Sequence, residues 1–238
     1  MKLEFLPQLS CFDRKRGLIL PKIISNDLAE FLGILAGDGC IAKYVRGRKV
    51  DYWISIVGNS IDDEKYIKNH VIPLIKNLFN INPKIYEFKK QKTIRISIRS
   101  KGLFNFLKTL GMNIGPKKNI HIPYIIKMKR NFFFSFLRGF MDTDGSVYLR
   151  NGNYPVLSNS QKSRKIIEEI ELYLKNFGFS TYVNYNIVRN DKRGFTSTGH
   201  RIYLYGHKNF RKWLELIGFN NPKNIEKCSV WGRRDLNT

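Results

Sequence analysis

The sequence predicts an α+β protein that is a pseudo-twofold tandem repeat of two halves, each with the element order α-β-β-α-β-β-α. One observation is a motif that occurs twice: an apolar, helix-like run that ends in Asp-Gly lies at residues 28–41 and again at 132–147. A second is that the two motif aspartates, Asp38 and Asp144, are 106 residues apart (144 − 38). A third is that strand-like and helix-like segments follow each motif in the same order.

Shorter matches recur at nearly the same offset. They are Asn59-Ser60 with Asn159-Ser160, Lys76-Asn77 with Lys175-Asn176, and Lys118-Asn119-Ile120 with Lys223-Asn224-Ile225. Coincidence does not explain so many ordered matches, so we expect the two halves to share one fold.

The first half begins after a lead-in of residues 1–24. Asp27 and Glu30 resemble a capping box, which predicts the start of the first motif helix. Pro73 predicts a kink in the following long helix. Isoleucines alternate with Thr, Ser and Arg over 93–99, the pattern of a strand with one core face and one polar face. The predicted elements are strands around a basic turn in 41–58, a helix at 62–79, strands at 84–89 and 93–99, and a helix at 102–111.

The second half repeats this order. The predicted elements are a motif helix at 132–143, strands at 146–150 and 154–158, a helix at 162–177, strands at 181–188 and 201–205, and a helix at 208–217. The predicted domain division is 1–24 (lead-in), 25–120 (first half), 121–130 (linker) and 131–238 (second half).

The two motif aspartates suggest a cation site. A carboxylate in the last turn of a helix is mildly unfavourable, because the helix C-terminus carries partial negative charge. Small residues four apart, Gly33 with Gly37 and Gly139 with Thr143, would let the two motif helices approach closely. Asp38 and Asp144 would then be adjacent, and two close carboxylates favour a divalent metal such as Mg²⁺. We expect the glycine after each aspartate to end its helix in the left-handed conformation.

The motifs resemble the signature of the LAGLIDADG homing endonucleases. Residues 31–39 read FLGILAGDG and residues 137–145 read LRGFMDTDG. The resemblance covers the chain from about residue 25 and implies two motif helices at a central interface, flanked by two antiparallel sheets that form a DNA-binding saddle. Its eighth position holds the metal-binding acid, here Asp38 and Asp144. The sixth position is acidic only in the second copy (Asp142), because the first has Ala36.

The resemblance also implies further site residues. The helix-ending carbonyls of Gly37 and Thr143 would add metal ligands. By their order in the repeat, Asn59 and Asn159 or Gln161 would position water, and Arg99, Lys101 and Lys208 would place positive charge near the scissile phosphates. The candidates for DNA contact on the sheets are Arg46, Arg48, Lys49, Lys90, Lys92, Arg95, Asn184, Asn186, Arg189, Lys192, Arg193 and Arg201.

Composition favours a nucleic-acid partner. The chain has 42 Lys+Arg against 19 Asp+Glu, a formal net charge of +23 over 238 residues, and a polyanion is the expected partner of such a surface. No apolar run approaches the ~20 residues of a membrane span. The three cysteines form no CxxC pair, so we expect a reducing, intracellular location, either a microbial cytoplasm or an organelle matrix.

We expect a monomeric, Mg²⁺-dependent endonuclease that makes a double-strand break in a long, asymmetric DNA site. The alternative is an intron maturase, which would bind intron RNA on the same fold. The retained aspartates favour the nuclease. A protein-splicing element is not expected, because the chain starts with Met1 and ends in Leu236-Asn237-Thr238, without the terminal residues that such elements use.

Overall fold

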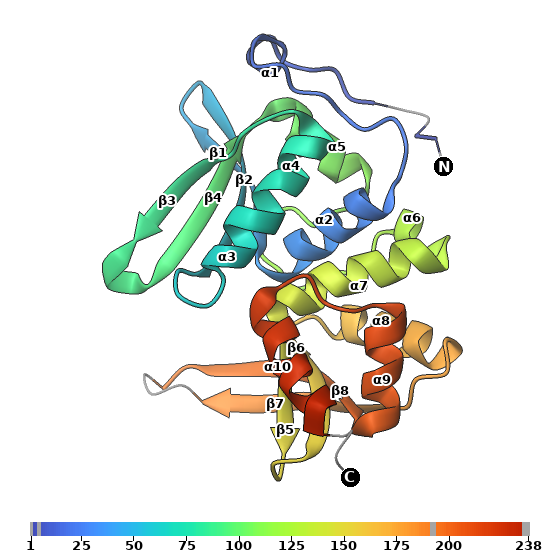
Figure 1. Ribbon diagram of the computed structural model, residues 1–238. Helices are drawn as coiled ribbons and strands as arrows, with labels where there is room; N and C mark the ends of the chain where they lie inside the picture. The colour runs from blue at the N-terminus through green and yellow to red at the C-terminus, as the bar shows by residue number, and fades with distance from the viewer. Residues whose placement is uncertain (1, 4–5, 191–193, 235–238) are drawn as a thin grey trace.

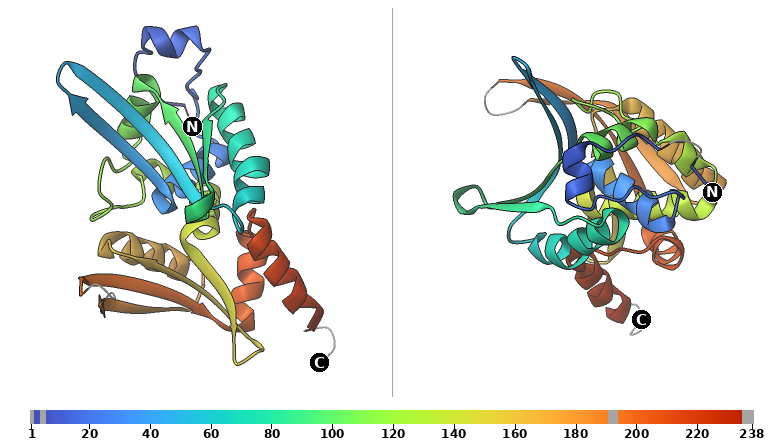
Figure 2. Two further views of the ribbon diagram at one scale, coloured as in Figure 1. Left: turned by 90° about the vertical axis from the view of Figure 1, so that its left-hand side faces the viewer. Right: turned by 90° about the horizontal axis from the view of Figure 1, so that it is seen from above.

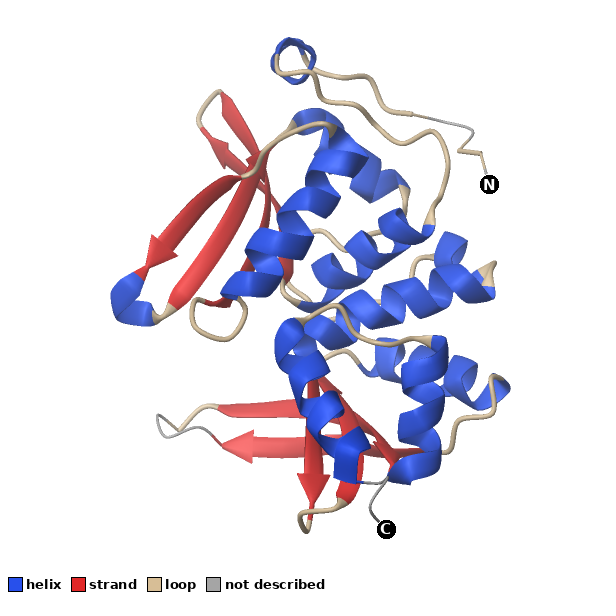
Figure 3. Ribbon diagram, viewed as in Figure 1, coloured by secondary structure: helices blue, strands red, loops and turns tan. Residues whose placement is uncertain are grey.

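The computed structural model describes residues 2–3, 6–190 and 194–234, with side chains up to residue 229 (Figure 1). It has the predicted α+β architecture, with two four-stranded antiparallel sheets, each backed by helices on one face (Figure 3). The strand orders are β1-β2-β4-β3 and β5-β6-β8-β7, so the two sheets have equivalent topologies.

The first half matches most of the predicted elements. Its elements are α1 (Cys11–Lys15), α2 (Asn26–Gly37), β1 (Gly39–Arg46), β2 (Lys49–Asn59), α3 (Glu64–Tyr66), a π-helical turn (Ile67–Val71), α4 (Ile72–Phe79), β3 (Lys84–Phe88), a 3₁₀ turn (Lys89–Gln91), β4 (Thr93–Arg99) and α5 (Lys101–Thr109). The widened π turn lies directly before Pro73, which is in the first turn of α4. The predicted irregularity in this helix is therefore present.

The second half, with the segment that leads into it, has two helices more than predicted. Its elements are α6 (Tyr124–Lys127), α7 (Arg130–Asp144), β5 (Gly145–Arg150), β6 (Tyr154–Gln161), α8 (Arg164–Asn176), β7 (Thr181–Asn190), β8 (Thr196–Tyr205), α9 (Gly206–Leu216) and α10 (Pro222–Arg234). Helix α10 was not predicted, and neither was α6, which lies in the predicted linker 121–130. Strands β7 and β8 are longer than predicted, because the pairing continues past a bulge between Asn184 and Ile187.

The two motif helices pack against each other through the predicted small residues (Figure 1). A Cβ atom on Gly33 would overlap the backbone carbonyl of Phe136, and one on Gly139 would overlap the carbonyl of Glu30. A Cβ on Gly37 would collide with the hydroxyl of Thr143. Glycine is therefore required for the backbone contact that brings the ends of α2 and α7 together.

The conformation predicted for the two glycines after the aspartates was wrong. Neither Gly39 nor Gly145 has a positive φ, and each is the first residue of a strand. A Cβ at Gly39 would overlap the backbone of Leu35, and one at Gly145 would overlap the backbone of Met141. Glycine is needed at both positions because the strand that follows passes close to the backbone of the last turn of the preceding helix.

The predicted start of the first motif helix was also wrong. Ser25 is the N-cap, and its hydroxyl accepts a hydrogen bond from the Leu28 amide at 3.1 Å. Glu30 is free of any capping role and lies buried between the two halves. It accepts hydrogen bonds from Arg138, with Nη2 to Oε2 at 2.6 Å, and from the Asn220 side chain at 2.7 Å. His70 Nε2 lies 2.6 Å from the other oxygen, so these contacts connect α2 to α7 and to the second half.

The lead-in is attached to the first half through a buried carboxylate. Asp13 accepts hydrogen bonds from the hydroxyls of Ser10 (2.6 Å) and Ser100 (2.7 Å) and from the Gly102 amide (2.9 Å). Burial opposes ionisation of Asp13, but these hydrogen bonds outweigh it and lower its pKa to about 2. Figure 2 shows α1 at the end of the first half that is far from α7.

Each sheet has one face on the helices and one open face. In β4, Ile94, Ile96 and Ile98 are buried as predicted, and Arg95 and Arg99 are on the other face. The left view of Figure 2 shows the strands of the first sheet above those of the second, with both sheets on the same side of the molecule. No helix among the described residues has the length and apolarity that a bilayer crossing requires.

Candidate active site and nucleic-acid interface

The two motif aspartates lie at the adjacent ends of the motif helices, between the two sheets. Asp38 is the C-cap of α2, and its carbonyl accepts a hydrogen bond from the Val57 amide of β2 at 3.2 Å. Asp144 is the last residue of α7 and accepts a hydrogen bond from Gln161 Nε2 at 3.0 Å. Burial and the nearby charge of Asp144 raise the pKa of Asp38 to about 7. A bound cation would offset this cost of ionising Asp38.

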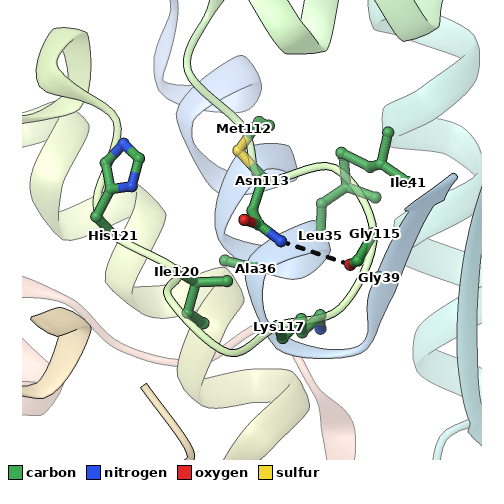
Figure 4. Close-up of a pocket in the computed structure, with 10 residues that line it drawn as sticks. All are labelled: Leu35, Ala36, Gly39, Ile41, Met112, Asn113, Gly115, Lys117, Ile120 and His121. Atoms are coloured by element: carbon green, nitrogen blue, oxygen red, sulfur yellow. Dashed lines mark hydrogen bonds between the residues drawn. The ribbon is translucent and has the colours of Figure 1, made fainter. Parts of the chain in front are cut away.

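Lys117 reaches this site from the segment that joins the two halves. Its ammonium donates a hydrogen bond to the carbonyl oxygen of Gly37, and it interacts electrostatically with both Asp38 and Asp144. Burial lowers the pKa of Lys117, although the two aspartates oppose this. Figure 4 shows Lys117 and Ala36 lining one small pocket beneath the loop. Lys117 was not among the residues predicted for the site.

Lys223 approaches from the equivalent segment of the second half, at the start of α10. Its ammonium pairs with Asp63 Oδ1 at 2.6 Å, and its charge also acts on Asp38. Lys117 and Lys223 are 106 residues apart (223 − 117), the same offset as the two aspartates. The repeat therefore contained a signal for both lysines. The predicted match paired Lys118 with Lys223, an offset of 105 residues (223 − 118), and therefore did not identify Lys117.

Asp142, the sixth motif position, supports the Lys223 segment. Its carboxylate is fully buried and accepts hydrogen bonds from the Asn220 amide (2.7 Å) and from Asn224 Nδ2 (3.1 Å). Asn221 donates to the Asp142 carbonyl at 3.0 Å. Burial raises the pKa of Asp142 to about 6, although the hydrogen bonds oppose this. Ala36 occupies this position in the first half, so the Lys117 segment has no equivalent carboxylate.

The predicted water-positioning residues differ in their placement. Gln161 Nε2 contacts both Asp144 and the Asn159 side chain, each at 3.0 Å, so these two amides line the second aspartate. Asn159 Nδ2 is buried without a hydrogen-bond partner. Asn59 is exposed at the end of β2, where its side chain accepts hydrogen bonds from the amides of Ile61 and Asp62. The structure therefore uses the Asn59 side chain in a turn.

The structure does not bring the two predicted catalytic lysines to the aspartates. Lys101 begins α5, after the outer end of β4. Arg99, two residues before Lys101, is paired with Trp53 of β2. Val57, whose amide contacts Asp38, lies four residues further along β2, which corresponds to about 13 Å of strand. Lys208 lies at the equivalent outer position in α9, beyond the end of β8. The order of residues in the repeat pointed to Lys101 and Lys208, but it did not indicate which end of each strand lies near the aspartates.

The predicted DNA-contact residues cluster on the open sheet faces and their connecting turns. The registers place Arg46, Lys49, Arg95 and Arg99 on the open face of the first sheet, and Asn184, Arg189 and Arg201 on that of the second. Arg48, Lys90 and Lys92 are exposed in the turns of the first sheet. Asn186 lies in the β7 bulge, with a φ of 56°. Lys192 and Arg193 lie outside the described residues.

Aromatic side chains share these faces and were not among the predicted site residues. In the first sheet, Trp53 lies beneath the guanidinium of Arg95, 5.8 Å from ring centre to Cζ. In the second sheet, Tyr203 and Tyr205 stack with ring centroids 5.2 Å apart. Tyrosine and tryptophan in alternation with polar residues on a strand are the sequence signal for this feature.

The oxygen atoms at this site suit a divalent cation whose remaining ligands come from the backbone and from water. Within the described ranges, no three His, Cys, Asp or Glu side chains cluster as a metal site. Two carboxylates are nevertheless adjacent, and the Gly37 carbonyl beside them already accepts a positively charged donor. Mg²⁺ is commonly bound by one or two carboxylates and completes its octahedral shell with water. Asp38 and Asp144 therefore suit a metal of this kind.

Comparisons with known proteins agree with this geometry. The family model for a LAGLIDADG-like domain matches residues 131–218. A probable translation initiation factor IF-2 of Methanocaldococcus jannaschii is 26% identical over 233 residues, which cover 94% of this chain and 17% of that protein. The chain spans less than two thirds of the length of its curated relatives, for example 17%, 59% and 21% of three of them.

Solved structures share the whole fold. The structure of I-DmoI in complex with DNA and Ca has a TM-score of 0.61 at 20% identity, covering 87% of this chain and 97% of that chain. The LAGLIDADG meganuclease I-AabMI bound to uncleaved DNA has a TM-score of 0.53 at 13% identity, covering 90% and 93%. The second half of this chain therefore contains a LAGLIDADG-like domain, and the chain as a whole shares the fold of these solved structures.

Proposed function

We propose that the protein is a homing endonuclease that acts as a single chain and cleaves both strands of a long, asymmetric DNA site. The observation that carries this proposal is the pairing of Asp38 and Asp144 at one point between two open, basic sheet faces. A duplex has strands related by twofold symmetry, and the pseudo-twofold arrangement of the two halves suits it. Imperfect repetition of the sheets implies an imperfectly palindromic site.

Asp38 and Asp144 would hold the divalent cation, with the carbonyl oxygens of Gly37 and Thr143 as further ligands. Related structures carry Ca, Mn or Mg with DNA, and we propose Mg²⁺ for this chain because its donors are all oxygen atoms. When bound, the cation supplies Lewis acidity and lowers the pKa of a bound water.

The chain's own residues orient the DNA around this point. Basic residues on the open sheet faces bind phosphates and base edges. Lys117 and Lys223 supply one ammonium from each half, and such positive charge stabilises the charge that develops on a phosphate in the transition state. Gln161 fixes the position of the Asp144 carboxylate.

The test is cleavage of a plasmid library carrying randomised or host-derived sites, with Mg²⁺ or with chelator. We expect a linear product that requires the metal and is lost in Asp38→Asn and Asp144→Asn. Asp62→Asn is the matched control, because Asp62 is an exposed carboxylate. Cleavage that survives in both motif variants would contradict the proposal. The maturase alternative would instead give tight binding to structured RNA without cleavage of any library member.

A further inference from the structure

The open face of the second sheet carries a cluster of five tyrosines. The tyrosine cluster consists of Tyr148 on β5, Tyr154 on β6, Tyr182 on β7, and Tyr203 and Tyr205 on β8. The strand registers place them together, since Tyr182 pairs with Tyr203, and Tyr148 and Tyr205 both pair with Val156 of the central strand. The cluster therefore crosses all four strands of the sheet.

The rings form a surface that is open to solvent. The ring centroid of Tyr182 lies 6.1 Å from those of Tyr203 and Tyr205, and the rings of Tyr203 and Tyr205 are stacked. Tyr148, Tyr154 and Tyr182 are 40%, 43% and 54% exposed. Val156, beneath the rings, is fully buried. The tyrosines thus cover the sheet and form an aromatic patch on the surface of a protein of net charge +23.

The first sheet presents different chemistry at the equivalent place. Its open face carries Arg46, Lys49, Arg95 and Arg99, and the Arg95 guanidinium covers the rings of Trp53 and Phe88 at 5.8 and 5.3 Å. Arg201 lies over the Tyr203 ring of the second sheet in the same way, at 5.7 Å, and Tyr44, Tyr86 and Phe88 are exposed on the first sheet. These three rings lie only on the edge strands β1 and β3, whereas the tyrosines of the second sheet lie on all four strands. The second sheet therefore presents the more continuous aromatic surface to a groove.

We propose that the tyrosine cluster is a subsite that recognises the C5-methyl groups of thymines in the major groove of one half-site. This inference rests on the proposed function and specifies its substrate. The thymine methyl is the apolar group that the major groove presents, whereas arginine is suited to the acceptors of guanine. Arg150, Arg189 and Arg201 surround the cluster and supply phosphate contacts. The half-site under the second sheet is accordingly richer in thymine than the half-site under the first.

The first step of the test is selection of bound duplexes from a randomised library. The orientation of each selected site is read with an iron chelate attached to Cys11 in the Cys40→Ser variant, because Cys11 is exposed in the first half and Cys228 is buried. We expect DNA cleavage by the chelate at the end of the site opposite the thymine-rich half. Thymines that are evenly distributed, or concentrated beneath the first sheet, would overturn the inference while leaving the nuclease proposal standing.

The second step replaces thymine by deoxyuridine, which removes only the methyl group. We expect binding to weaken roughly fourfold for each methyl removed beneath the second sheet, and to change little beneath the first. The Tyr182→Ser and Tyr203→Ser variants should lose this sensitivity, whereas Tyr203→Phe should retain it because it keeps the ring. Tyr124→Ser is the matched control, since Tyr124 is 75% exposed on α6, away from the sheets.

The outcomes separate the two proposals. Equal deoxyuridine sensitivity in wild type and in the folded Tyr→Ser variants would overturn the methyl subsite, even if the selected DNA is cleaved. Failure to select any duplex would instead contradict the proposed function, and this inference with it.

Discussion

The segments that carry Lys117 and Lys223 occupy equivalent places in the two halves but are held in different ways. The Lys223 segment is attached to α7 through the buried Asp142, and its lysine pairs with Asp63. The Lys117 segment lies over Ala36, and its lysine donates to the Gly37 carbonyl beside the two motif aspartates (Figure 4). The repeat has kept the lysine and its spacing, whereas the contacts that position it have diverged.

The two acidic positions of the repeated motif therefore have different roles. The eighth position, Asp38 and Asp144, is acidic in both halves because both carboxylates meet at one site. The sixth position acts within its own half, where Asp142 satisfies the amides of Asn220 and Asn224. Other contacts can replace such local support, and Ala36 shows that the first half does so.

The largest expected effect comes from the lysines themselves. Lys117→Met should slow cleavage of DNA by about 10²- to 10³-fold with little change in DNA binding, because it removes positive charge beside the reacting phosphate. Lys223→Met should have a smaller effect, since Lys223 also neutralises Asp63. Nicking rates on each labelled strand at saturating protein measure both. Lys118→Met is the control, because Lys118 is exposed next to Lys117. Equal losses in the Lys117 and Lys118 variants would refute a specific role.

Removal of the Asp142 carboxylate should destabilise the second half. Asp142→Ala leaves the buried donors of Asn220 and Asn224 without an acceptor, at a cost of about 3 kcal/mol. Ala36→Asp should also destabilise the protein, by about 2 kcal/mol, because it buries a carboxylate near Ile41 and Ile120. Urea unfolding measures both variants. A change below about 0.5 kcal/mol in Asp142→Ala would show that the attachment is not stabilising.

The stability of the metal-free protein should depend on pH through Asp38. Its pKa is about 7 in the folded state against an ordinary value of 3.8 for an aspartate, so the folded protein binds more protons between these values. The free energy of unfolding should therefore fall as pH rises from about 4 through about 7, by up to about 4 kcal/mol, since each pKa unit corresponds to about 1.4 kcal/mol. Asp38→Asn should remove this part of the decline. Unfolding curves between pH 4 and 8 with chelator test this, and parallel profiles for wild type and variant would contradict it.

The smallest expected effect is at the ion pair between Asp63 and Lys223. Asp63→Asn removes a partly exposed pair with Lys223 and should lower stability by about 1 kcal/mol or less. High salt should reduce the difference between variant and wild type, because screening weakens the pair. Thermal unfolding at two salt concentrations measures this. A loss that persists unchanged at high salt would mean that Asp63 acts through its hydrogen bond with Asn221 instead.

Much of the fold followed from local pattern. The isoleucine alternation of 93–99 and the small residues of the motif helices were sufficient to predict a strand and a helix interface. Helix α10 was missed because its first turns, residues 222–229, contain few apolar residues, of which Cys228 is buried. The start of α2 was misplaced because Glu30 suits a capping box in sequence, although its partners are 40 to 190 residues away.

The candidate site was predicted at its centre and less well at its edge. Asp38 and Asp144 meet because each ends a helix of the interface, which the repeated motif encodes directly. Lys117 and Lys223 lie in connecting segments, where no periodicity indicates direction, so only their spacing could have revealed them. The tyrosine cluster depends on the order of strands in the sheet, which alternation within each strand does not contain.

The contact between Glu30 and Arg138 prevents either half from serving as its own partner. With the offset of 106, the counterpart of Glu30 in the second half is Phe136 (30 + 106), and the counterpart of Arg138 in the first is Leu32 (138 − 106). A homodimer of first halves would bury two glutamates opposite leucines, and a homodimer of second halves would bury two arginines opposite phenylalanines. The two halves of the chain are thus complementary at this contact, and a chimera that exchanges one half should keep the acid–base pair intact.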